Sequence, residues 1–257
     1  MPAYYNEIDP YAAQWLRNLI AAGHIAPGDV DERSILEVKP DDLRSYTQCH
    51  FFAGIGGWSY ALRLAGWPDD RPVWTGSCPC QPFSAAGKQR GSDDARHLWP
   101  AFFDLIRECR PASVFGEQVA GAAGYAWWDH VAADMEGAHY AAAAVDIGAH
   151  SIGAPHRRQR LYWAASNTKR NEQSWEEPCG RAVGRMGWQQ QLLSWDEGWP
   201  AALARLRVVD DGIPRSVAAT DAARNAIVPQ VAAVFVMANV ELSGDSGTPE
   251  ASDPMLG

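Results

Sequence analysis

One cysteine of this chain stands in a segment that suits a nucleophile. Cys80 lies within Gly76-Ser77-Cys78-Pro79-Cys80-Gln81-Pro82-Phe83-Ser84, just after a short apolar run with Val73 and Trp74. Two prolines fix φ around it, and residues at the carboxyl end of a strand face the usual ligand-binding edge of an α/β sheet. A thiolate held there can attack an electrophilic carbon. An ordinary loop with a buried thiol is the alternative, and a lone cysteine favours that alternative.

A glycine-rich loop indicates a ligand site. Phe52-Ala53-Gly54-Ile55-Gly56-Gly57 lies between a predicted strand and a predicted helix. Glycines let a backbone approach a ligand closely, and a helix N-terminus favours negative charge. No Gly-Lys-Ser/Thr follows, so the loop is not a Walker loop. The ligand could be a nucleotide, or an adenosyl group that carries a carboxylate.

Three acids and two arginines stand near predicted strand ends. In doubly wound sheets an acid placed like Glu7 often holds ribose hydroxyls, and Asp29 could accept a hydrogen bond from an adenine amine. Glu117 near Cys80 could have a raised pKa and donate to a ring nitrogen. Arg158 and Arg160, two apart at a strand start, would share a face and grip a base edge or a phosphate. For each residue a plain surface role is the alternative.

Strand and helix patterns alternate over most of the chain. Strands are predicted at 3–8, 49–52, 72–75, 112–115, 139–147 and 160–165, and helices at 10–23, 58–65, 98–109, 126–136 and 225–240. A polar linker is expected from Val30 to about Thr47, and Glu117 is expected to follow its strand. The alternation predicts an α/β fold with a doubly wound, mainly parallel sheet.

Composition limits the class of protein. The 257 residues suit one α/β domain with a small appendage, and the net charge of −9 argues mildly against a surface that grips nucleic acid all over. Arginines gather after residue 156, which leaves room for a local basic cleft. The five cysteines form no paired framework, and Cys78-x-Cys80 lacks a second ligand pair, so we expect a reducing cytoplasm and no metal. No apolar run reaches membrane-spanning length.

Together these segments resemble the cytosine-C5 DNA methyltransferases, in the compact form found in bacteriophages. Pro79-Cys80-Gln81 with Pro82-Phe83-Ser84 resembles the family's nucleophile motif, and Phe52–Gly57 resembles its cofactor loop. Glu117-Gln118-Val119 resembles a Glu-Asn-Val motif with Gln for Asn, and Arg158-Gln159-Arg160 resembles an Arg-x-Arg motif. The stretch from Asn225 to Val231 resembles the closing Gly-Asn motif, with Arg224 in place of Gly.

The resemblance implies a Rossmann-like class I methyltransferase that transfers a methyl group from S-adenosylmethionine to C5 of a cytosine flipped out of double-stranded DNA. Cys80 would add to C6 of the base, with Glu117, Arg158 and Arg160 as its catalytic partners. The implied cofactor residues are Phe52, Ala53, Gly54, Ile55, Gly56, Gly57, Glu7, Ile8, Asp29, Val30, Pro79, Asn225 and Ala226. The implied substrate contacts are Gln81, Ser84, Gln118 and Val119. A monomer away from membranes, in a bacterial or phage-infected cytoplasm, is expected.

The same resemblance divides the chain into parts. Residues 1–165 and 213–240 are expected to form the catalytic, S-adenosylmethionine-binding domain. Residues 166–212, rich in Trp, Gln, Arg and Gly, are expected to form a small target-recognition lobe. Residues 241–257 have the composition of a disordered tail.

The order of the motifs departs from the family. The usual order is glycine-rich loop, ribose acid, adenine acid and then cysteine, but here the gap from Gly57 to Cys80 is too short for two strand–helix units. Asn6–Ala12 resembles the ribose-acid motif and Gly28-Asp29-Val30 the next one. The chain is therefore predicted to be circularly permuted, which surface termini tolerate. In the alternative, both motifs are lost and residues 1–47 are an unrelated leader.

Two other functions remain open. The same C5 chemistry would serve a methyltransferase that acts on RNA cytosines, whereas the Asp/Asn-Pro-Pro-Tyr/Phe tetrapeptide of adenine enzymes is absent. Gln118 and Arg224 also leave open a degenerate homologue that binds DNA without turnover.

Overall fold

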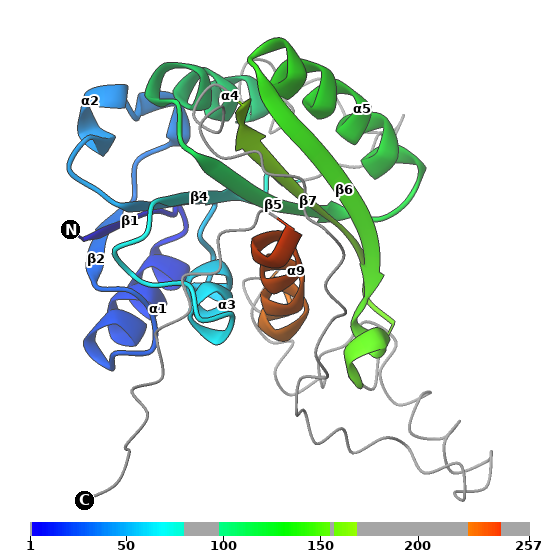
Figure 1. Cartoon of the computed structure of the whole chain (residues 1–257). Coiled ribbons are helices and arrows are strands. Elements are labelled where there is room, and N and C mark those ends of the chain that lie inside the picture. The colour runs from blue at the N-terminus through cyan, green and yellow to red at the C-terminus, as the bar shows by residue number, and fades with distance from the viewer. Residues whose placement is uncertain (1, 80–97, 155–156, 169–225, 243–257) are drawn as a thin grey trace, which may run out of the picture.

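A computed structural model describes residues 2–79, 98–154, 157–168 and 226–242, and in them one sheet lies between two layers of helices (Figure 1). The strands are β1 (Ala3–Asn6), β2 (Gly28–Asp31), β3 (Gln48–Phe51), β4 (Val73–Gly76), β5 (Ser113–Val119), β6 (Tyr140–Gly148) and β7 (Gln159–Asn167). Their order across the sheet is β2-β1-β3-β4-β5-β7-β6. The strands β1 to β5 run parallel to one another, and β7 is antiparallel to β5 and β6. The prediction of a doubly wound, mainly parallel sheet is confirmed.

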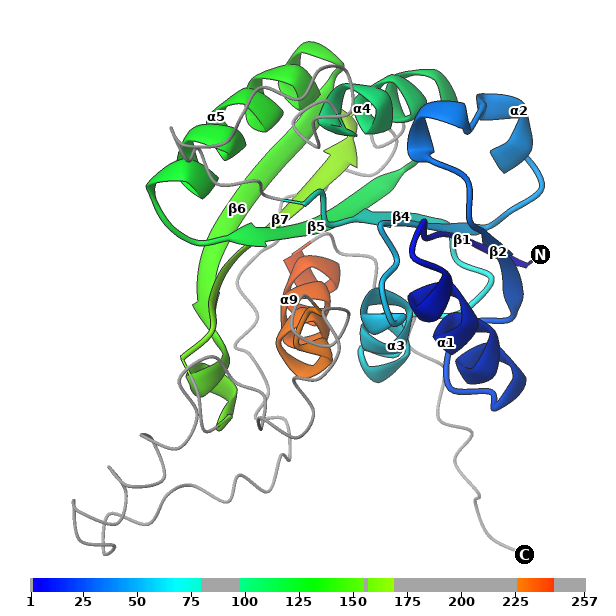
Figure 2. The ribbon, with the colours of Figure 1, turned by 180° about the vertical axis from the view of Figure 1, so that it is seen from behind.

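Helices cover both faces of this sheet (Figures 1 and 2). One face carries α1 (Pro10–Ala21), α3 (Gly57–Leu64) and α9 (Pro229–Leu242), and the other carries α2 (Pro40–Leu43), α4 (Leu98–Cys109) and α5 (Ala122–Gly137). Because strand side chains alternate, β5 feeds both cores: Val114 packs with Phe102 of α4, and Phe115 packs with Trp58 of α3. The two buried layers hold the carboxyl ends of the strands in a fixed arrangement.

The first helix begins where the sequence indicates. The Asp9 carboxylate accepts a hydrogen bond from the Ala12 amide at 2.8 Å, and Pro10 opens the helix. The turn after α1 passes through Gly23 at φ +72°, a conformation that glycine adopts without strain. The Asp9 cap fixes the chain direction just after Glu7, which lies between β1 and α1.

The strand β5 is longer than predicted. The sequence pattern predicts that this strand ends at Phe115, but β5 pairs with β7 in antiparallel register from Ser113 to Val119. Gly116 permits this pairing, because a Cβ atom there would lie 2.2 Å from Cε2 of Trp163. The prediction that Glu117 follows the strand is therefore wrong, and both Glu117 and Gln118 project from the strand itself.

The expected polar linker after Val30 is also partly wrong. It holds the end of β2, a 3-10 helix η1 (Ile35–Glu37) and α2. A capping box between Ser34 and Glu37 starts η1, which is a local signal that the polar composition hid. At the other end of the chain, α9 begins at Pro229 rather than at Asn225, as the preference of proline for a first helical turn explains.

Most of the predicted recognition lobe and of the predicted tail lies outside the described residues. β7 itself continues past residue 165 to Asn167, so the sheet extends slightly beyond the predicted edge of the catalytic domain. A 3-10 helix, η3 (Ala149–Ile152), connects β6 toward Arg158.

Candidate active site

Three of the predicted site segments follow neighbouring strands at one edge of the sheet. In register, Asn6 of β1 pairs with Phe51 of β3, which pairs with Gly76 of β4. The chain leaves these parallel strands as Glu7, as the Phe52–Gly57 loop and as the Ser77–Pro79 segment. Parallel strands place such residues side by side at their carboxyl ends, where doubly wound folds bind ligands.

Glu7 is joined directly to the glycine-rich loop. The amide of Gly54 donates a hydrogen bond to Oε2 of Glu7 at 2.7 Å, and the amide of Asp9 donates to Oε1 at 2.9 Å. The amide of Ala53 also donates to the Asn6 carbonyl at 3.0 Å. These bonds fix a partly exposed carboxylate beside the loop, and its remaining lone pairs can accept from vicinal hydroxyls.

The loop itself has room beside it for a ligand. Gly54 and Gly56 have φ of +54° and +81°, and a Cβ atom at Gly54 would meet nothing within 4 Å. Gly56 precedes α3 without a side-chain cap, so the first amides of that helix can face a negative or polar group. At Gly57 a Cβ atom would lie 2.7 Å from Cγ1 of Ile227, which holds the chain before α9 against this loop.

The other predicted cofactor residues fall around this loop. Ile8 is exposed, Phe52 packs edge-on against Phe102, and Val30 packs against the small core under β1. A cavity of about 350 Å³ lies under the loop, lined by Leu19, His24, Ile25, Ile55, Gly56, Gly57, Tyr60, Ala226, Ile227 and Pro229. Ala226 thus lies beside the loop, while Asn225 lies outside the described residues.

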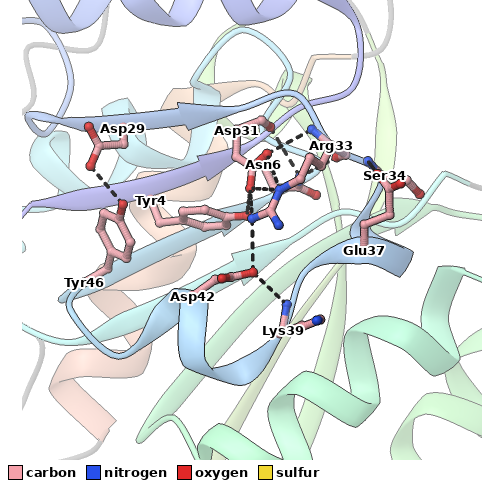
Figure 3. A network of polar contacts seen from close by, with 10 residues as sticks. All are labelled: Tyr4, Asn6, Asp29, Asp31, Arg33, Ser34, Glu37, Lys39, Asp42 and Tyr46. Carbon is pink, nitrogen blue, oxygen red and sulfur yellow. Dashed lines mark hydrogen bonds and ion pairs between the residues drawn. The ribbon is translucent and has the colours of Figure 1, made fainter.

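Asp29 lies within β2, whereas Glu7 directly follows the end of β1. Asp29 pairs in register with Tyr4, two residues before the strand end at which Asp31 pairs with Asn6. The Asp29 carboxylate accepts a hydrogen bond from the Tyr46 hydroxyl at 2.9 Å (Figure 3). A strand advances about 3.3 Å per residue, so Asp29 is set back by roughly 7 Å from that edge. Its role toward an adenine amine stays a prediction.

A buried ion pair occupies the β5–β7 side of the same edge. Nε of Arg160 lies 2.8 Å from Oε1 of Glu117, whose side chain is only 9% exposed. Burial raises the pKa of Glu117, and the charges of Arg160 and Arg158 act against that shift without cancelling it. Arg158 precedes β7 at φ +29°, and its guanidinium donates to the carbonyl of Ala226. The three charged residues of the two predicted motifs therefore meet at one place.

The segment that enters Cys80 is anchored from two sides. Nε1 of Trp58 donates to Oγ of Ser77 at 2.9 Å, and Nε2 of Gln118 donates to the carbonyl of Cys78 at 3.2 Å. Burial raises the pKa of the Cys78 thiol, so this neighbouring cysteine is packing material rather than a reactive group. Neither anchor could be predicted from the sequence, because no local pattern pairs residues so far apart in the chain.

Not every predicted site residue can be placed. Pro79 and Val119 are exposed at the same edge. Cys80, Gln81 and Ser84 lie outside the described residues. Within residues 2–79, 98–154, 157–168 and 226–242, no three His, Cys, Asp or Glu side chains gather as a metal site, and no helix is long and apolar enough to cross a membrane.

The strand order, the helices on both faces and the glycine-rich loop at the carboxyl edge define a Rossmann-like α/β protein. Residues 68–184 match the sequence model of the family described as C-5 cytosine-specific DNA methylase. This match covers somewhat less than half of the chain, and over that stretch the chain is similar to the cytosine-C5 DNA methyltransferases.

Similar curated proteins are type II methyltransferases. M.AplI of Arthrospira platensis is 34% identical over 110 residues, which cover 42% of this chain and 31% of that protein. M.HhaI of Haemophilus parahaemolyticus is 26% identical over 185 residues, which cover 56% of each protein. The chain thus spans between about a third and about half of these relatives.

Two solved structures superimpose on part of this chain. A DNMT2 mutant of Spodoptera frugiperda superimposes with a TM-score of 0.48 and 15% identity, over 72% of this chain and 47% of that one. A putative DNA modification methyltransferase encoded within an E. coli prophage gives 0.44 and 18%, over 66% and 41%.

Proposed function

We propose that this chain is an S-adenosylmethionine-dependent DNA (cytosine-5)-methyltransferase. The observation that carries the proposal is the convergence of Glu117, Arg158 and Arg160 beside the segment that leads into Cys80. Glu117 lies far from Arg158 and Arg160 in the sequence, yet the three side chains meet at one edge of the sheet. Residues 166–212 would supply recognition of the target sequence.

The cofactor would lie between Glu7 and the glycine-rich loop. Glu7 would accept from the ribose hydroxyls, and the loop and the start of α3 would face the amino-acid part of the ligand. The open space beside Gly54 and the uncapped start of α3 support this fit. S-adenosylmethionine supplies an electrophilic methyl group on a sulfonium.

The remaining chemistry belongs to the residues of the chain. The Cys80 thiolate would add to C6 of the cytosine, which makes C5 nucleophilic. Glu117, whose pKa is raised by burial, would keep a proton available for N3 while its other oxygen accepts from the exocyclic amine. Arg160 would donate to O2. After the methyl group is bound to C5, the C5 proton would go to a water molecule, Cys80 would leave as thiolate and N3 would return its proton to Glu117, which restores the aromatic ring.

We further propose that the chain is circularly permuted within this family. If β3 and its glycine-rich loop are counted as the first unit, β1 and β2 become the second and third strands. The order β2-β1-β3-β4-β5 then reads 3-2-1-4-5, the order of the dinucleotide-binding fold. The bond between Glu7 and Gly54 supports the same view, because it puts the proposed ribose acid beside the proposed cofactor loop.

Substitution of Glu7 tests this placement of the cofactor. Replacement by Gln removes a charge-assisted acceptor, so E7Q should bind S-adenosylhomocysteine about 10-fold or more weakly in calorimetry. The matched control is E32Q, because Glu32 directly follows β2 and pairs with Arg17 on the surface. An E7Q protein with the affinity of the wild type would mean that residues before β3 do not hold the cofactor.

Covalent trapping tests the activity itself. The protein is incubated with S-adenosylmethionine and duplex DNA that contains 5-fluorocytosine, and a stable protein–DNA adduct is expected. C80A should form no adduct, whereas C109A, at the end of α4, should form it normally. If the wild type binds the cofactor but traps neither this DNA nor matched transfer RNA, the proposal fails. Trapping of the RNA alone would assign the activity to RNA.

A further inference from the structure

The segment between β4 and Cys80 is held by two side chains from separate elements. Trp58, in the first turn of α3, donates its indole N–H to the Ser77 hydroxyl at 2.9 Å. Gln118 of β5 donates its amide N–H to the Cys78 carbonyl at 3.2 Å. The two donors thus act on consecutive residues of the chain just before Pro79.

Both donors are themselves fixed in place. Gln118 is 2% exposed, and its Oε1 accepts the amide of Val119 at 2.9 Å, so its side chain has one defined orientation. Trp58 is 5% exposed and stacks on Phe115 with ring centroids 6.3 Å apart. Hydrogen bonds shielded from water hold geometry more strictly than exposed ones, because a broken bond leaves a buried polar group without a partner.

Each donor also belongs to one half of the site. Trp58 directly follows Gly57 at the end of the glycine-rich loop, and Gln118 directly follows Glu117. The segment that enters Cys80 is therefore tied to the proposed cofactor loop on one side and to the strand of the catalytic carboxyl on the other. Proline at 79 has a fixed φ, which removes one backbone rotation between the anchored pair and Cys80.

We infer that Trp58, through Ser77, and Gln118, through Cys78, are positioning residues that set where Cys80 stands relative to Glu117 and the glycine-rich loop. The inference rests on the proposed function and goes beyond it by giving Trp58 and Gln118 a part in placing the nucleophile, without contact of either side chain with the base or the cofactor. It also changes the role of Gln118 from substrate contact to backbone anchor. A glutamine suits this role because its side chain, which is longer than that of the asparagine in the family motif, reaches both the Cys78 carbonyl and the Val119 amide.

Single substitutions can remove each anchor with little change in volume. S77A deletes the acceptor for Trp58, and S77T keeps it. Q118M removes both hydrogen bonds of the Gln118 side chain at nearly constant size. Q118E keeps the acceptor for the Val119 amide but loses the donor to the Cys78 carbonyl. The control is S59A, since the Ser59 hydroxyl on α3 also takes part in side-chain hydrogen bonds, but with Tyr5 and the Ala26 amide rather than with the segment before Cys80.

The first readout is methyl transfer in a single turnover. A misplacement of about 1 Å can slow a reaction about 100-fold, so S77A, Q118M and Q118E should each be slower by about 10-fold or more. S77T and S59A should stay near the wild type, and S-adenosylhomocysteine should bind all variants alike. Equal losses in S59A and S77A would reduce the effect to general destabilisation and overturn the inference.

The second readout does not depend on turnover. The rate of alkylation of Cys80 by iodoacetamide is followed against pH by tandem mass spectrometry of its peptide. S77A and Q118M should shift this profile, and S59A should not. An unchanged profile in folded S77A and Q118M overturns the positioning role. Failure of wild-type trapping, with shifted profiles in the variants, would instead remove the proposed activity and leave the positioning role in place.

Discussion

Two arginine–carboxylate sites lie at the same edge of the sheet in different surroundings. On the β5–β7 side, the side chains of Arg160 and Glu117 are 20% and 9% exposed. On the β2 side, Arg33 is 46% exposed and pairs with Asp31 and Asp42, in a network that also includes Tyr4 (Figure 3). The chemical groups are the same, but their access to water differs.

The balance between burial and hydrogen bonding differs between the two carboxyl groups, and their pKa values shift in opposite directions. Burial raises the pKa of Glu117 even though two arginines oppose it. Burial also acts on Asp31, but hydrogen bonds from Arg33 and Tyr4 outweigh it and its pKa is lowered. A carboxyl that keeps its proton more readily suits proton donation, whereas one that stays charged suits a structural contact. We therefore assign chemistry to the first site and support of the chain after β2 to the second.

The largest expected effect comes from Glu117. E117Q keeps the shape of the side chain but cannot exchange the proton, so methyl transfer should fall by about 100-fold to 10,000-fold in single-turnover assays. The same change at the outer site, D31N, should leave transfer nearly unchanged. Transfer by E117Q at close to the wild-type rate would erase the functional distinction between the two sites.

The second effect concerns stability at the buried pair. R160M leaves Glu117 buried without its nearest counter-charge, so the free energy of unfolding in urea should fall by about 3–5 kcal/mol near neutral pH. Lowering the pH should recover part of this loss, because protonation removes the uncompensated charge of Glu117. A loss that does not depend on pH would point to packing rather than to charge.

The residues of the candidate site could be predicted from the sequence more readily than the contacts that support them. Glu7, Glu117 and Arg160 belong to short local motifs, and the alternation of strands and helices brings such motifs to one edge. The bonds from Trp58 to Ser77 and from Gln118 to Cys78 join residues 19 and 40 positions apart, and no periodicity marks them. The extension of β5 likewise depends on a distant partner strand, because Gly116 and Glu117 by themselves resemble a turn.

His50 offers a third buried polar group, without an arginine partner in contact among the described residues. Burial lowers its pKa to about 3, its Nδ1 lies 2.8 Å from Oγ1 of Thr75, and its ring stacks on Tyr5. The unfolded chain protonates near pH 6.5 while the folded chain stays neutral, so stability is present above pH 6.5 and is lost as the pH falls toward 3. The expected loss is about 2 kcal/mol between pH 6.5 and about pH 5.

Urea unfolding of wild type and H50Q across this pH range measures that loss. The variant lacks the titrating ring, so the stability of the wild type should fall relative to that of H50Q as the pH is lowered. Parallel curves would show that burial does not depress the pKa of His50, and would weaken the same argument for Glu117.

The smallest effect is expected at the outer site, where R33M removes the pairing with Asp31 and Asp42. The side chains of Arg33 and Asp42 are 46% and 34% exposed, and exposed pairs contribute about 0–1 kcal/mol, so the free energy of unfolding in urea should change by less than about 1 kcal/mol. Added salt should reduce even this difference, because screening weakens exposed charges more than buried ones. If R33M instead destabilises the protein as much as R160M does, solvation is not what separates the two sites, and the network around Asp31 carries more of the fold than its exposure indicates.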